Sequence, residues 1–233
     1  MRLDRWLVTL GLGSRSEVQR LIRSGAVCVE GNCVRDPSAD FPTEITPLAV
    51  GGKAVDGRLV RHVMLHKPAG LLTAARDKKQ PTVMDLLPPA YGAMGCMPVG
   101  RLDKDTTGLL LLTDDGPLAH KLISPKYHVP KVYLADIDGR AGEEDIAAFA
   151  AGLVLEDGSV CRSAKLEDLG EGRVRVTLQE GKYHQVKRML AARGKPVTYL
   201  KRVRFGPLVL DSGLEKGRWR ALTEEEKSSL FRH

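Results

Sequence analysis

The 233-residue chain has a formal net charge of +7 at pH 7 and a sequence pI of about 9.3. Its content of 42% hydrophobic and 28% charged residues is typical of a soluble globular protein. No apolar run reaches the ~18 residues that a membrane-spanning helix needs, and the N-terminus lacks the apolar segment of a signal peptide. Because aromatic residues make up only 5% of the chain, a platform that stacks many bases of single-stranded nucleic acid is not indicated.

The four cysteines favour a cytoplasmic protein without a metal site. Cys28, Cys33, Cys96 and Cys161 form no Cys-x-x-Cys pair, and no histidine cluster completes a zinc pattern. We therefore expect reduced thiols and no bound metal. Because the sequence has no apolar run long enough to span a bilayer, we also expect no contact with a membrane.

The positive charge of the chain is concentrated in one segment. Residues 180–204 contain eight basic residues and one acidic residue, a net charge of +7, so the rest of the chain is neutral overall. Clustered Lys and Arg side chains are the expected footprint of phosphate contacts. A charge run is often only a solvated helix face, but a cluster that equals the excess of the whole chain favours a nucleic-acid partner.

Residues 1–35 predict two short helices followed by a hairpin. The first helix is expected over residues 2–9. Ser14 and Glu17 have the spacing of a capping box at the start of the second helix, which should end at Gly25. The segment holds six arginines against three acids, so it should present a basic surface.

This N-terminal segment resembles the alpha-L RNA-binding module first seen in a small-subunit ribosomal protein. The resemblance covers residues 1–48 and rests on Arg2-Leu3-Asp4, Ser14-Arg15 and the hairpin sequence over residues 25–31. In that family the second helix and the hairpin present basic groups to folded RNA. The resemblance therefore implies that RNA is contacted by Arg2, Arg15, Arg20, Arg23 and Asn32.

The remainder of the chain predicts a second, larger domain. Two prolines and three glycines between residues 42 and 58 predict a trailing strand and then a linker over residues 49–60. The second domain should occupy residues 61–233, where expected strands outnumber helices and mostly follow one another through hairpins. The fold class is therefore α+β: a small N-terminal RNA-binding domain followed by a domain with a mainly antiparallel mixed sheet.

A charged segment between two glycines is the strongest candidate for a catalytic loop. Residues 100–108 include Arg101, Asp103 and Asp105, and the apolar run over residues 109–112 predicts a buried strand directly after them. Loops held by rigid elements are common places for catalytic groups. A charged loop can equally be a solvated surface.

The residues alone leave several kinds of chemistry open. A hydrolase with paired carboxylates could use Asp103 and Asp105, or Asp114 and Asp115, and a Ser or Cys nucleophile with a histidine stays possible. A glycine-rich phosphate-binding loop is absent from the sequence. Alternatively, Asp103 alone could act at a sugar carbon if a cation kept it ionised and oriented. The candidate cations are Arg101, Lys187 and Arg188.

Four segments in order resemble the motifs of the pseudouridine synthases that carry an alpha-L module at the N-terminus. They are residues 65–70, 100–110, 131–133 and 180–189, and the match extends from residue 1 to about residue 226. The Asp-Thr-Thr-Gly, Thr-Asp-Asp-Gly and Tyr-His-Gln-Val-Lys-Arg-Met sequences are similar to the branch of the family that acts on small-subunit ribosomal RNA. His66 departs from that branch, which often has Asn there.

The resemblance implies an isomerase that flips a uridine out of the RNA, breaks its base–sugar bond and rejoins the uracil through ring carbon five. Asp103 would be the catalytic aspartate and Tyr133 would stack on the uracil. Lys187 would be the basic partner of the aspartate, with Arg188 as the alternative. No cofactor or metal is implied. Further RNA contacts are expected from Arg101, Arg188, Lys201 and Arg202.

The expected partner is small-subunit ribosomal RNA or its assembly intermediate, bound by a monomer. One rival interpretation is the same reaction on large-subunit ribosomal RNA. Another is a non-catalytic RNA-binding or ribosome-assembly protein, which would have no use for the Asp103 carboxylate near phosphates. A glycosidase is a third, but it requires a second acid opposite Asp103 and leaves the basic cluster unexplained.

Overall fold

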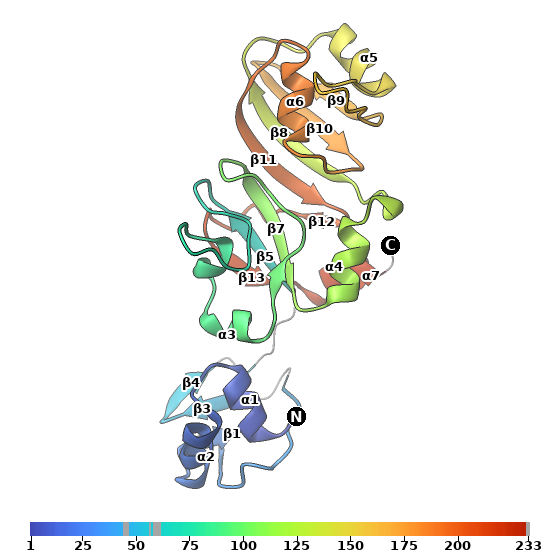
Figure 1. Ribbon diagram of the computed structural model, residues 1–233. Coiled ribbons are helices and arrows are strands. Elements are labelled where there is room, and N and C mark those ends of the chain that lie inside the picture. The colour runs from blue at the N-terminus through green and yellow to red at the C-terminus, as the bar shows by residue number, and fades with distance from the viewer. Residues whose placement is uncertain (44–46, 56, 58–61, 232–233) are drawn as a thin grey trace. The chain divides into compact units, whose positions relative to one another are not determined.

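The computed structural model describes residues 1–43, 47–55, 57 and 62–231 of the chain, which separate into two compact units (Figure 1). One unit contains the described residues of Met1–Arg61 together with Leu87–Cys96, and the other contains His62–Leu86 and the chain from Met97 onward. In the described part of the chain, no helix combines the length and apolar character needed to cross a membrane.

The first unit places two helices against a four-stranded antiparallel sheet. The two helices are α1 (Leu3–Thr9) and α2 (Arg15–Arg23). The strands follow the spatial order β2 (Asn32–Val34), β1 (Val27–Val29), β3 (Leu48–Val50), β4 (Lys53–Val55). The apolar faces of these elements form one core around the fully buried Trp6. The short helix α3 (Pro89–Ala93), which the sequence did not predict, belongs to the same unit.

The start of α2 follows the predicted capping pattern in part. The Glu17 carboxylate accepts hydrogen bonds from the backbone N–H of Ser14 at 2.7 Å and from its hydroxyl at 2.6 Å. This satisfies a backbone donor at the helix start that would otherwise lack a partner. It also fixes the N-terminal end of the helix that exposes Arg15 and Arg20.

Two expectations about the first unit differ from the structure. The linker expected from residue 49 is not extended chain, because β3 and β4 form a hairpin that continues the sheet to Val55. Residues 56 and 58–60 of that expected linker lie outside the described residues. The expected reduced thiols of Cys28 and Cys33 are instead joined as a disulfide, since the register of β1 and β2 places them directly opposite one another. Cys96 and Cys161 are buried.

The second unit is built on a nine-stranded sheet. Seven strands follow the order β13-β5-β7-β11-β8-β10-β9, with β12 paired to β11 and β6 paired to β7. Their bounds are β5 (His62–Lys67), β6 (Met97–Pro98), β7 (Thr107–Thr113), β8 (Lys131–Ile137), β9 (Lys165–Asp168), β10 (Arg173–Leu178), β11 (Val197–Phe205), β12 (Leu208–Val209) and β13 (Trp219–Ala221). Only β7 and β11 run parallel among these pairs, so the predicted α+β fold with a mainly antiparallel mixed sheet is confirmed.

Helices flank the sheet at both of its ends (Figure 1). They are α4 (Gly116–Ile123), α5 (Glu143–Ala151), α6 (Gln185–Ala191) and α7 (Glu224–Phe231), with 3-10 turns η1 (Val83–Leu86) and η2 (Pro125–Tyr127). Side chains from β5, β7, α4 and α7 form one apolar core. Every residue of β7 is buried, which confirms the buried strand expected over residues 109–112.

A single glycine allows β7 to lie beside β11. Gly108 has φ of +109°, and a Cβ built there would overlap the backbone carbonyl of Arg202. The two residues are paired in the parallel register. Any larger residue at position 108 would therefore have to move β11 and the side chains it carries.

We expect Gly108→Ala to lower the free energy of unfolding by at least about 2 kcal/mol more than a matched glycine change, because the added methyl group is forced into packed backbone. The control is Gly139→Ala, at φ of +94°, where a Cβ would meet nothing within 4 Å. The control carries only the left-handed backbone cost of ~1–2 kcal/mol. Urea denaturation of both variants tests this, and equal losses would contradict the role of the strand crossing.

Candidate active site

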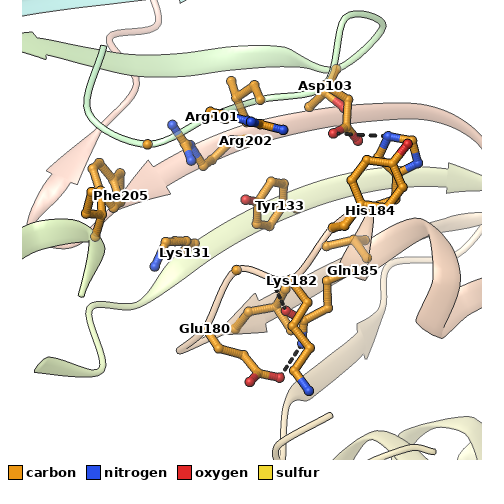
Figure 2. Close-up of a pocket in the computed structure, with 18 of the residues that line it drawn as sticks. Arg101, Asp103, Lys131, Tyr133, Glu180, Lys182, His184, Gln185, Arg202 and Phe205 are labelled. Atoms are coloured by element: carbon orange, nitrogen blue, oxygen red, sulfur yellow. Dashed lines mark hydrogen bonds and ion pairs between the residues drawn. The ribbon is translucent and has the colours of Figure 1, made fainter. Parts of the chain in front are cut away.

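A cavity of about 340 Å³ lies in the second unit (Figure 2). Its wall is formed by the loop before β7, the strands β8 and β11, and the segment between β10 and α6. The lining includes Arg101, Asp103 and Tyr133, three of the residues singled out from the sequence. Segments far apart in the chain thus meet around one concave site.

The Asp103 carboxylate is held between two basic side chains. Lys187 Nζ lies 3.3 Å from Asp103 Oδ2, and His184 Nε2 lies 3.5 Å from Oδ1. Lys187 also contacts Asp105 Oδ1 at 2.6 Å, and the hydrogen bond from Lys187 lowers the pKa of Asp105. The opposite charge of Lys187 thus stabilises the ionised form of Asp105.

Of the three cations expected near Asp103, the structure places one, Lys187, in contact with the carboxylate. Arg188 instead pairs with Asp157 at 2.6 Å, and Arg101 lines the cavity with an exposed side chain. His184 was not assigned to the site from the sequence, although it falls within the motif at residues 180–189.

A buried lysine fixes the backbone of the Asp103 loop. The Lys67 ammonium donates hydrogen bonds to the carbonyl oxygens of Asp103 and Lys104 at 3.0 and 3.2 Å, and to those of Thr106 and Pro68 at 2.9 and 3.0 Å. Burial lowers the pKa of Lys67 to about 8, while the nearby aspartates oppose the shift. The side chain thus remains a donor at neutral pH and anchors three carbonyls of the loop at one point.

The Asp103 loop is also held from outside the sheet. The Thr73 hydroxyl donates to the carbonyl oxygen of Leu102 at 2.7 Å and lies 3.2 Å from its backbone N–H, from which it accepts. Leu102 is buried directly before Asp103. The carboxylate therefore projects from backbone that is bonded on both sides.

Tyr133 lies on β8 between the two ends of the cavity in the view of Figure 2. Its ring is 9% exposed, and the residue pairs with Arg202 of β11 in the antiparallel register. Lys131, two residues earlier on the same face of β8, lines the far end together with Phe205. No role was expected from the sequence for Lys131, Phe205 or Lys67.

The expected RNA-binding residues occupy three kinds of environment. In the first unit, exposed positions are held by Arg2, Arg15, Arg20, Arg23 and Asn32. Two of these, Arg2 and Arg15, also contact the buried Asp4 carboxylate at 3.0 and 3.7 Å. Lys201 is half-buried on β11. Arg202 was expected to contact RNA at the surface. It is instead only 2% exposed and lies in the cavity wall.

Comparisons to known proteins identify a family for each of the two units. The RNA pseudouridylate synthase family matches residues 61–192, and the S4 domain family matches residues 1–40. An RNA pseudouridine synthase of Bacillus subtilis, itself uncharacterised, is 44% identical over 97% of this chain and 96% of its own length. The ribosomal small subunit pseudouridine synthase A of Escherichia coli is 38% identical over 99% of this chain and all of its own.

A solved structure supports the same assignment. The crystal structure of a pseudouridylate synthase has a TM-score of 0.69 and 36% sequence identity, and the match covers 99% of each chain. The chain belongs to the RNA pseudouridylate synthase family. It is a pseudouridine synthase, an isomerase, with an N-terminal S4 domain, as the motif resemblance implied.

We expect Lys67→Met to lower the free energy of unfolding by about 2–4 kcal/mol, because four carbonyl oxygens lose their shared donor. It should also reduce the rate of pseudouridine formation at least about tenfold by loosening the Asp103 loop. Lys104→Met is the matched control, since this lysine of the same loop is exposed and its ammonium donates to Gln80 Oε1. Denaturant unfolding and turnover of both variants test the prediction; similar behaviour would contradict it.

Proposed function

We propose that the chain converts one uridine of small-subunit ribosomal RNA to pseudouridine, with Asp103 as the catalytic carboxylate. The observation that carries this proposal is the Asp103 carboxylate, held by Lys187 and His184 at a cavity that also contains the Tyr133 ring. A cavity of about 340 Å³ suits one flipped nucleoside and excludes a duplex.

The reaction rearranges atoms that the substrate already contains. The bond between uracil N1 and ribose C1′ breaks, the ring turns, and a bond forms between C5 and C1′. C5 then loses a proton and N1 gains one, so the product is an isomer of the uridine. This balance needs no oxidant or reductant, and a carboxylate can act at the anomeric centre as positive charge develops there.

Each cavity residue has a role that its position supports. Lys187 contacts Asp103 and can orient its carboxylate, and the Tyr133 ring can stack on the flipped uracil. Arg101 is exposed at the cavity, where it can contact the RNA strand around the flipped nucleotide. These assignments extend the family membership to individual side chains of this chain.

The choice of small-subunit ribosomal RNA rests on relatives and on the N-terminal unit. The relatives from Escherichia coli and Salmonella typhimurium that align over 99% of this chain are named ribosomal small subunit pseudouridine synthase A. The S4 domain of this chain exposes a set of basic side chains suited to phosphates. We propose that this domain docks on the RNA and that the second unit performs the chemistry.

The substrate proposal is tested by incubating the protein with small-subunit and large-subunit ribosomal RNA made without modifications, followed by mapping of pseudouridine. One new pseudouridine in the small-subunit RNA is expected. Product only in the large-subunit RNA would contradict the proposed substrate but support the proposed reaction. The absence of product in both RNAs and in partly assembled small subunits would contradict the proposal as a whole.

We expect Asp103→Asn to abolish detectable turnover while RNA affinity changes by less than about tenfold, because the change removes a reactive group and no phosphate contact. Asp138→Asn, at an exposed position outside the cavity lining, is the control and should behave as the wild type. Single-turnover assays at saturating RNA and filter binding measure the two quantities. Normal turnover by Asp103→Asn would exclude this residue as the catalytic carboxylate.

Replacing Arg15, Arg20 and Arg23 together by Gln should weaken RNA binding and flatten its salt dependence. Each lost phosphate contact is expected to reduce the slope of log affinity against log salt by about 0.7–0.9. Turnover at saturating RNA should be unchanged. The control replaces Lys165, Arg173 and Arg175, which contact Glu167 or Asp136, and alters net charge equally. The same salt slope in both triple variants would contradict a docking role for the module.

A further inference from the structure

Two cations enter the cavity from neighbouring strands at the end away from Asp103. Tyr133 of β8 pairs with Arg202 of β11, and Lys131 pairs with Phe205. The register shifts between Arg202 and Arg204. Residues three positions apart face opposite sides of a regular strand. The extra residue on β11 changes this, so that Arg202 and Phe205 both line the cavity. Lys131, Tyr133, Arg202 and Phe205 therefore form one cross-strand group.

Arg202 has a buried donor that the protein does not use. Its side chain is 2% exposed, and Nε donates to the Leu109 carbonyl at 2.9 Å. One terminal nitrogen, NH2, has no hydrogen-bond partner among the described residues. The guanidinium lies over the Phe205 ring at 4.9 Å. A buried donor without a partner is destabilising, so its presence in a cavity wall points to an acceptor on a ligand.

Lys131 adds a second uncompensated charge to the same end of the cavity. Its ammonium donates to the Val129 carbonyl at 3.0 Å and lies 5.5 Å from the Phe205 ring centroid. Within the described chain, neither Lys131 nor Arg202 forms an ion pair with an acid. Burial, and then the charge of Arg202, lowers the pKa of Lys131 to about 8. Most Lys131 side chains thus keep their charge at neutral pH.

The acids of the cavity are already engaged elsewhere. Asp103 contacts Lys187 and His184, and Glu180 Oε1 accepts from the Gln185 amide at 2.5 Å and from the Arg162 backbone at 3.0 Å. Arg202 is the charged group that acts on Lys131. Buried charges are normally paired, so the positive end of the cavity lacks a negative or strongly accepting partner.

We propose that Arg202 and Lys131 form a subsite that binds the carbonyl oxygens of the uracil ring and stabilises its negative charge while the ring is detached from the sugar. This inference rests on the proposed function. In the view of Figure 2, Tyr133 lies between Asp103 with His184 on one side and Lys131 with Phe205 on the other. A uracil stacked on Tyr133 with its ribose at Asp103 would extend its far edge toward the two cations.

The charge balance of the reaction explains why cations belong at this position. When the bond between N1 and C1′ breaks, its electron pair stays on the uracil, and the negative charge spreads over N1, O2 and O4. Donors aimed at those oxygens stabilise the charge as it develops. They can also hold the ring while it turns to present C5 to C1′. The negative charge on the ring is neutralised when C5 bonds to C1′, and the later loss of a proton from C5 and gain of one at N1 leave the ring neutral.

A base is a better occupant of this subsite than a backbone phosphate. Arg202 is 2% exposed, so a phosphodiester would have to enter the deep part of the cavity with the flipped nucleotide. The Phe205 ring, itself 1% exposed, forms an apolar surface suited to a planar ring. The phosphate interpretation is therefore kept as an outcome of the test.

The test uses two free pyrimidines, uracil and 6-azauracil, as probes. The ring N–H of 6-azauracil is the more acidic, so at about pH 7.5 this probe is largely an anion while uracil is neutral. The wild-type protein should bind 6-azauracil at least about tenfold more tightly than uracil, as measured by NMR titration. Arg202→Met and Lys131→Met should each lose most of this preference. Equal binding of both probes by the wild type would contradict the proposal that this subsite stabilises a negatively charged ring.

Kinetics on ribosomal RNA separate the base from the phosphate interpretation. Arg202→Met and Lys131→Met should reduce the single-turnover rate at saturating RNA at least about a hundredfold, with RNA affinity within about threefold. Lys126→Met, an exposed lysine of η2 that does not line the cavity, is the control. An unchanged rate with weaker binding and a flatter salt slope would identify phosphate contacts and overturn the proposal.

Two further variants keep the test decisive if the methionine variants fold poorly. Arg202→Lys retains the charge and should recover part of the probe preference. Lys131→Arg likewise retains the charge and should recover part of the preference for 6-azauracil. A folded charge-retaining variant that binds both probes equally would remove the substituted residue from the subsite. The probe assay needs no turnover, so its outcome is independent of whether the proposed RNA is the substrate.

Discussion

The site depends on the hydrogen bonds from the Lys67 ammonium to the carbonyls of the loop that carries Asp103. Lys67 is also the last residue of β5, where it pairs with Gly108 of β7. Gly108 pairs with Arg202 of β11, and Arg202 pairs with Tyr133 of β8. One row of backbone pairs across four strands therefore links the loop anchor, the close strand crossing, the buried guanidinium and the aromatic ring. A shift of any strand in this row would displace several side chains of the cavity together.

In the proposed reaction, the two ends of the cavity have different electrostatic roles. At one end Lys187 and His184 contact the Asp103 carboxylate, whose negative charge suits positive charge that develops on the sugar. At the other end Arg202 and Lys131 have no acid partner in the described chain, which suits charge that develops on the base. Breaking a base–sugar bond separates positive from negative charge, and an arrangement with complementary groups at both ends stabilises both fragments.

The sequence predicted several helices and strands well, because these depend on local patterns. The leucine run identified β7, and Gly25 and the capping residues identified the ends of α2. The residues alone left Arg101, Lys187 and Arg188 open as the cation near Asp103, because Lys187 and Arg188 are adjacent in sequence and the direction in which each side chain points depends on how α6 is rotated. The family resemblance favoured Lys187, which does contact Asp103. The burial of Arg202 was missed for a related reason. It depends on the register and the bulge of β11, which a basic sequence cluster does not reveal.

The most direct measurement of the central claim is a crystal structure of the Asp103→Asn variant with a small-subunit ribosomal RNA fragment that contains the modified uridine. The account predicts one uridine turned out of the RNA, with its ring on Tyr133, its ribose C1′ next to the side chain at position 103, and its carbonyl oxygens toward Arg202 and Lys131. A complex in which RNA crosses the protein without placing a base in this cavity would contradict the account.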